Sequence, residues 1–241
     1  MGTVHPGERP LIPTDAATVR SAKSHGFEEE TNESQPLWVT FAGLMFGIVA
    51  GSFEILNTSI GWHLASGRWM LDQRTILDHN PFTLGADGAA WLNHEWLFQI
   101  VVALIERLGT GPGLIGLRIF VAIVLTLLLM RFGRRAGLSP ASSLVLACLC
   151  VAGARMRFYV RPELATLVLV PLGINLFLTR IQRRTIATAA ALALITAVGV
   201  NLHGGILVLP AILAALVAKG WEVADLGMQM AIEVFKAPII G

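Results

Sequence analysis

Long apolar runs that lack charged residues constrain this chain more than any other feature of its sequence. The clearest run covers residues 113–130 and is interrupted only by Arg118 near its start. A helix needs about 20 mainly apolar residues to cross the hydrocarbon core of a bilayer. Charged residues make up only 14% of the chain, whereas soluble domains usually contain about 25%. The sequence therefore predicts an integral membrane protein.

The fold class predicted from these runs is all-α, as a polytopic transmembrane helical bundle of about six spans. The spans form one transmembrane domain over residues 37–218. The apolar runs cover residues 37–56, 113–130, 139–154, 162–178, 186–200 and 206–218. The last two runs predict either a tight helical hairpin or a partly re-entrant pair.

Two polar segments flank this domain. Residues 1–36 contain Pro6, Pro10 and Pro13 and no apolar stretch of the kind that a signal peptide has. They predict a loosely ordered cytoplasmic tail. Residues 219–241 are weakly amphipathic and predict a C-terminal tail that includes a surface helix.

The segment at residues 94–108 has two interpretations. Its apolar stretch is short for a span, and Glu95, Gln99 and Glu106 fall on one helical face. This pattern favours an interfacial helix in the first external loop, residues 57–112. The alternative is a short, tilted span.

Arginine-rich links predict the orientation in the membrane. The links at residues 131–135 and 180–184 are separated by two crossings and therefore lie on the same side. Basic residues prefer cytoplasmic loops, so this side is predicted to be the cytoplasm. Both chain termini are then cytoplasmic if residues 94–108 are interfacial, and the N-terminus is external if they cross. The net charge of +2 is too small to indicate a nucleic-acid partner.

This topology collects polar residues on the extracytoplasmic face. Their clustering beside apolar spans is the most informative functional feature, because ionisable residues next to membrane segments are functional candidates by default. The candidate site residues are Glu54, His63, His94, Glu95, Arg155, Arg157, Arg161, Glu163, Asn201 and His203.

Each group of candidates has a functional and a structural interpretation. The three arginines, Arg155, Arg157 and Arg161, suit a phosphate group, or they contact ordinary anionic headgroups of membrane lipid. Glu95 is a candidate catalytic carboxylate, with His94 placed to orient it or share its proton, and Glu163 is a candidate for substrate binding. The structural interpretation of both is a solvated interfacial acid.

Two histidines also have both a functional and a structural interpretation. His203 lies in the break Asn201–Gly205, where glycines permit a close approach of backbone to a ligand, and it binds substrate or caps two helices. His63 and the nearby tryptophans form either a sugar-stacking platform or an aromatic belt at the membrane interface.

The order of these motifs resembles the N-terminal part of the polytopic GT-C glycosyltransferase superfamily. The matching pieces are WHLASGRW at residues 62–69, NPFT at 80–83, WLNHEWL at 91–97, RPE at 161–163 and NLHGG at 201–205. The resemblance covers about residues 37–218 and extends to bacterial plasma-membrane proteins. It implies transfer of a sugar from a polyprenyl-phosphate donor on the extracytoplasmic side.

The resemblance also implies an acid in the first external loop, acting as catalytic base or binding a divalent metal. Here Asn57 and Asn80 stand where acids are expected, and asparagine cannot accept a proton at neutral pH. Glu54 and Glu95 are the remaining candidates for a catalytic base.

These departures leave two functions open. One is a GT-C-type glycosyltransferase, active or reduced to an inactive remnant. The other is a non-catalytic membrane scaffold, or a partner subunit of a larger complex. Members of the superfamily usually continue for several more spans, so a fragment, a truncated paralogue and one half of a complex are all compatible with the sequence.

Overall fold

The computed structural model describes residues 35–55, 58–82, 88–180 and 186–219. By its internal contacts the chain divides into residues 1–34 and residues 35–241, and the described residues all belong to the second part. Nearly all of the predicted N-terminal tail, and all but the first residue of the predicted C-terminal tail, lie outside the described residues.

The described part of the chain is helical, as predicted, apart from connecting segments and one isolated β-bridge between His79 and Ala90. Two short 3-10 helices, η1 (Arg155–Arg157) and η2 (Gly204–Leu207), sit between longer helices. The α-helices are α2 (Leu37–Gly51), α3 (Ile60–Gln73), α4 (Trp96–Arg135), α5 (Pro140–Gly153), α6 (Glu163–Arg180), α7 (Ile186–Leu202) and α8 (Val208–Lys219).

Helix α4 is the centre of the packing and contacts α2, α3, α5, α6 and α7. Glycines allow α2 to approach it closely. A Cβ atom at Gly47 would lie 2.8 Å from the Cα of Ile123, and one at Gly43 would lie 2.8 Å from the sulfur of Met130. Small residues spaced by four allow apolar helices to pack backbone against backbone. The residues 43, 47 and 51 of α2 therefore form its contact face with α4.

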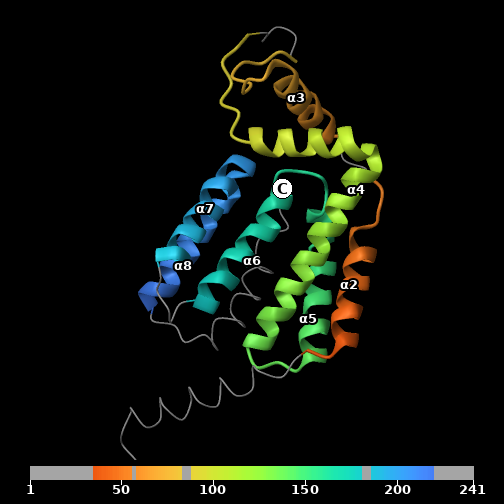
Figure 1. The fold of residues 1–241 in the computed structure, drawn as a ribbon, viewed down its shortest axis with the longest axis vertical. Helices are drawn as coiled ribbons and strands as arrows, with labels where there is room; N and C mark the ends of the chain where they lie inside the picture. The colour runs from red at the N-terminus through yellow and green to blue at the C-terminus, as the bar shows by residue number, and fades with distance from the viewer. Residues whose placement is uncertain (1–34, 56–57, 83–87, 181–185, 220–241) are drawn as a thin grey trace, which may run out of the picture. The chain divides into compact units, whose positions relative to one another are not determined.

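A sharp break at Thr110 divides α4 into two stretches. Thr110 has φ 52° and ψ −148°, and Pro112 follows it. Proline has no N–H to continue a helical ladder, which explains a break at this place. Figure 1 shows the first stretch lying across the end of the bundle and the second running along it. The break is confined to one residue with non-helical dihedral angles.

Helix α3 packs on the first stretch of α4. A Cβ atom at Gly67 would overlap the main-chain oxygen of Gln99. The Gln99 side chain is fully buried, and it exchanges two hydrogen bonds with Asn93, at 2.8 and 3.0 Å. Two ion pairs at the edge, Arg68–Glu106 and Arg107–Asp72, join the same two helices. The polar face predicted from Gln99 and Glu106 is thus covered by α3.

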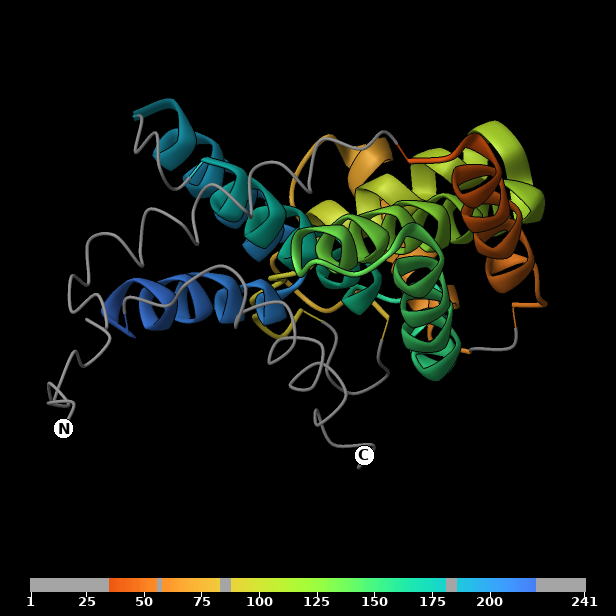
Figure 2. The ribbon, with the colours of Figure 1, turned by 90° about the horizontal axis from the view of Figure 1, so that it is seen from below.

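The remaining helices run between the same two ends. In Figure 1, α2, α5 and α7 run toward α3, whereas the second stretch of α4, α6 and α8 run away from it. Helices α7 and α8 both pack on α6, and they diverge from their connection in Figure 2. By length and composition, α4 is the described helix that can cross a membrane, and the other apolar helices have 10–17 residues.

Candidate functional site

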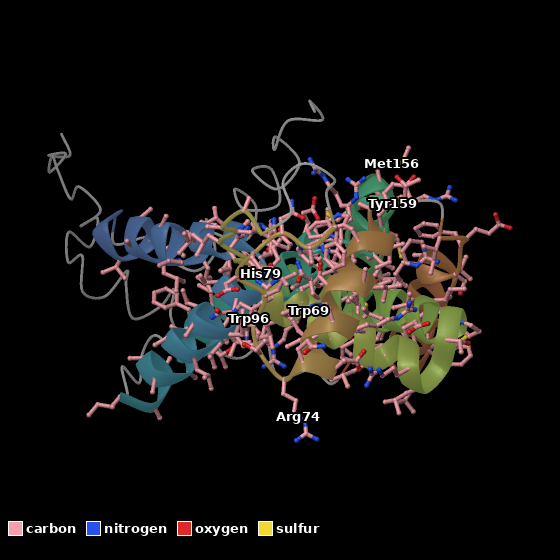
Figure 3. All side chains as sticks on the ribbon, turned by 90° about the horizontal axis from the view of Figure 1, so that it is seen from above. Trp69, Arg74, His79, Trp96, Met156 and Tyr159 are labelled. Carbon is pink, nitrogen blue, oxygen red and sulfur yellow. The ribbon has the colours of Figure 1, made fainter. Side chains whose placement is uncertain are left out.

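Because the helices alternate in direction, several connections meet at the end of the bundle that α3 covers (Figure 1). These connections follow α2, α5 and α7 and precede α4 and α6. Figure 3 looks onto this end, where Trp69, His79, Trp96 and Tyr159 are labelled. Almost all of the predicted site residues belong to these connections or to the adjoining helix ends.

Four titratable residues from three connections form what we call the acid–histidine cluster: His94, Glu95, Glu163 and His203. The Nε2 atom of His94 lies 3.6 Å from the Oε1 atom of Glu95. Burial raises the pKa of the Glu95 carboxyl, His94 opposes this shift, and the neighbouring Glu163 adds to it. Burial lowers the pKa of His203, with Glu163 opposing and His94 adding to the shift. These mutual effects place the four side chains in one electrostatic neighbourhood.

Helix ends hold this cluster in place. Glu95 directly precedes α4, and Glu163 lies in the first turn of α6, where a carboxylate is favoured by the helix dipole. The indole Nε1 of Trp96 donates a hydrogen bond to Oδ1 of Asn201, at 2.7 Å. This bond ties the start of α4 to the end of α7, so Asn201 positions the residue next to Glu95.

Thr166 also belongs to this neighbourhood, although the sequence did not single it out. Its Oγ1 atom lies 2.8 Å from Nδ1 of His203. Thr166 follows Glu163 by three residues, which places both on one face of a helix. This spacing was the sequence signal that could have identified Thr166 as a neighbour of the site.

A second group, the arginine–aromatic cluster, consists of Phe53, Arg118, Arg155, Tyr159 and Arg161. The Phe53 ring lies 4.0 Å from the Arg118 guanidinium and 5.5 Å from that of Arg155. Arg161 lies 5.9 Å from the Tyr159 ring, which meets the Phe53 ring edge-on at 6.3 Å. Cations are attracted to aromatic faces at such distances. No carboxylate in the described ranges forms an ion pair with these arginines.

Arg118 is the principal residue that the sequence interpretation missed. Its side chain is 0% exposed, and Nη1 donates to the main-chain oxygen of Glu54 at 3.2 Å. Its Nε and Nη2 atoms have no hydrogen-bond partner among the described residues. An arginine in an apolar run is itself a functional signal, but the sequence interpretation treated it only as an interruption of a span.

Arg161 links the arginine–aromatic cluster to α3. Its Nε atom donates to Oγ of Ser59 at 3.1 Å, one residue before α3 begins. Its charge also acts on His63, a buried residue of that helix. Burial lowers the pKa of His63 to about 4, and Arg161 adds to the effect. His63 packs between the rings of Trp62 and Phe98, which makes it a neutral packing residue beside the arginines.

Two predicted residues, Glu54 and Arg157, belong to neither cluster. Glu54 is exposed, and its described contact is the main-chain oxygen that accepts from Arg118. Arg157 is exposed in η1. The arrangement therefore favours Glu95 over Glu54 as the carboxylate of the site.

Asn80 has a structural role. Its Oδ1 atom accepts a hydrogen bond from the main-chain N–H of Phe82 at 3.0 Å, an arrangement typical of asparagine in turns. Its main chain also pairs with Ala89 and Gly88. This local role accounts for an asparagine where the resemblance implied an acid, and the other such position, Asn57, lies outside the described residues.

The divalent metal implied by the resemblance does not fit the described residues. No three of their histidine, cysteine, aspartate and glutamate side chains come together in a group that could hold a metal ion.

Comparison of the chain with protein-family models, with curated proteins and with solved structures finds no match.

Proposed function

We propose that this chain is an integral membrane, GT-C-like glycosyltransferase that transfers a sugar from a polyprenyl-phosphate donor at the extracytoplasmic face of a bacterial plasma membrane. One observation carries this proposal. A partly buried carboxylate with a raised pKa, Glu95, lies at the same end of the bundle as a set of arginines that lack carboxylate partners among the described residues. Transfer of a sugar from a phosphate-linked donor needs both a base for the acceptor hydroxyl and a group that binds the phosphate anion.

In this proposal the membrane surrounds α2, the second stretch of α4, and α5 to α8. Large apolar side chains such as Trp38, Phe41 and Val49 of α2 are exposed and suit a lipid environment. Arg131, Arg134 and Arg135 at the far end of α4 face the cytoplasm by the positive-inside rule. Helix α3 and the first stretch of α4 then lie at the extracytoplasmic interface.

The reaction is a displacement at the anomeric carbon of the donor. An acceptor hydroxyl forms the new C–O bond, and the bond between the sugar and the phosphate oxygen breaks with its electron pair leaving on the phosphate. Glu95 takes the hydroxyl proton, and its raised pKa makes it a stronger base. Arg161 and Arg155 bind the phosphate, because guanidinium groups match phosphate oxygens in pairs.

The decisive experiment is a transfer assay on the full chain reconstituted in lipid vesicles with a polyprenyl-phosphate sugar. We expect Glu95→Gln to lower kcat by about 10²- to 10⁴-fold, because the amide cannot accept the proton. Glu106→Gln is the matched control, since Glu106 lies on the same stretch of α4 and pairs with Arg68 outside the cluster. Full activity of Glu95→Gln would reject Glu95 as the base.

The turn-forming role of Asn80 favours a second candidate function, a non-catalytic scaffold or partner subunit. Purification of the full chain in mild detergent distinguishes the two. A partner protein that co-purifies in a fixed ratio, together with no transfer by the chain alone, would select the subunit. Transfer by the monomeric chain would reject it.

A further inference from the structure

The break between α7 and η2 folds the ring of His203 back onto its own main chain. His203 is extended, with φ −163° and ψ 129°, and the N–H of Gly205 donates to its Nδ1 atom at 3.3 Å. A Cβ atom at Gly205 would lie 2.7 Å from both Nδ1 and Cε1 of the ring. Only glycine leaves room for this contact. Gly204 differs, because a Cβ atom there would meet no atom within 4 Å.

These contacts determine which nitrogen of the imidazole carries the proton. A main-chain N–H can only donate, so Nδ1 of His203 must present its lone pair to Gly205. The hydroxyl of Thr166, 2.8 Å from the same atom, then donates as well. In a neutral imidazole one nitrogen accepts and the other carries the proton. The proton of neutral His203 therefore resides on Nε2.

The surroundings favour the neutral ring. Burial lowers the pKa of His203, and His94 acts in the same direction, whereas Glu163 opposes them. Two donors directed at Nδ1 add to the preference, because a protonated Nδ1 would face both of them without a lone pair. The Nε2 atom has no hydrogen-bond partner among the residues that the structure describes.

We propose that Thr166 and Gly205 are positioning residues that hold His203 as the Nε2–H tautomer, and that this N–H donates a hydrogen bond to an oxygen of the lipid-linked sugar phosphate. The substrate contact rests on the proposed function, whereas the tautomer does not. A nitrogen that already carries its proton cannot remove another. His203 is thus a binding donor, and proton removal is left to Glu95.

Nitrogen NMR of the full chain, labelled with ¹⁵N-histidine in detergent micelles, tests the tautomer directly. The His203→Phe variant identifies the His203 signals by their loss. At pH 7 we expect a neutral ring protonated at Nε2. We expect Gly205→Ala and Thr166→Val to shift the population toward the other tautomer, because each removes support for the lone pair at Nδ1. Thr166→Ser, which keeps the hydroxyl, and Gly204→Ala, which fills open space, should match the wild-type spectrum.

Three results would overturn the proposal: an imidazolium or Nδ1–H ring in the wild type, a wild-type spectrum for Thr166→Val, or equal shifts for Gly204→Ala and Gly205→Ala. The substrate contact is tested by kinetics. Thr166→Val should raise the KM for the donor about tenfold, as expected for a lost hydrogen bond of about 1.4 kcal/mol, and Thr166→Ser should restore it. An unchanged KM with an altered tautomer overturns the contact. No transfer by any variant or by the wild type overturns the proposed function, while the NMR result still decides the tautomer.

Discussion

His63 and His203 are histidines of one end of the same bundle, yet their surroundings differ. His203 has two donors directed at one ring nitrogen. His63 is only 3% exposed, and its Nδ1 atom has no partner among the described residues. The first arrangement leaves a nitrogen for a ligand, and the second makes the ring part of the apolar packing between α3 and α4. Residue type alone does not distinguish these roles.

His63 should make the stability of the protein depend on pH. Its folded-state pKa is lowered to about 4, so between about pH 6.5 and pH 4 the unfolded chain binds the extra proton. The contribution of neutral His63 to the free energy of unfolding is therefore complete above pH 6.5 and declines as the pH falls toward 4. Denaturant unfolding at pH 7 and pH 5 should show the wild type losing about 2 kcal/mol more than His63→Phe. Equal losses would contradict the buried, neutral histidine.

At the scale of elements, the contact between α3 and the first stretch of α4 sets the position of Glu95. A glycine contact joins these helices, and their ion pairs lie at the edge. The buried amide pair of Asn93 and Gln99 ties the connection that follows α3 to the start of α4. Exposed ion pairs contribute about 0–1 kcal/mol, so the buried contacts dominate. The positive φ of Thr110 at the break costs of order 1–3 kcal/mol.

Two glycines of α3 provide a matched test of this packing. Gly67→Ala should destabilise the protein by about 1–3 kcal/mol, because the methyl group would overlap the main chain of Gln99. Gly61→Ala should be neutral or stabilise by about 0.5–1 kcal/mol, since its Cβ would meet open space and alanine favours the helix. Unfolding midpoints of the two variants measure the difference. Equal effects would mean that α3 does not pack here as described.

At the scale of the whole molecule, the alternation of helix directions implies two opposite faces. Met156 lies at the α3 end, where Figure 3 labels it, and its side chain is 75% exposed. Ala136 follows α4 at the other end. If the bundle spans the membrane as proposed, these positions lie on opposite sides.

Cysteine labelling of the full chain in intact bacterial cells tests this topology. In a Cys148→Ala, Cys150→Ala background, Met156→Cys should react with a membrane-impermeant maleimide. Ala136→Cys should react only after the membrane is permeabilised, because the arginine-rich end of α4 is cytoplasmic. The reversed pattern would invert the topology, and labelling of both positions in intact cells would contradict a crossing between them.

The sequence by itself was sufficient for the features that depend on near neighbours in the chain. Apolar runs broken by polar links predicted an all-helical fold. The breaks also indicated which polar residues occur beside helix ends. Local composition and helical periodicity decide these features, and both can be read from a window of about 18 residues.

Only the tertiary structure decided which of these residues are neighbours. Glu95, Glu163 and His203 come from connections far apart in the chain, and the charge of Glu163 acts on both of the others. These connections come near one another because α4, α6 and α7 pack together. The same packing buries Arg118, covers Gln99 with α3 and leaves Glu54 at the surface. Burial and pKa depend on what lies across a contact, which is a property of the packed helices rather than of any one segment.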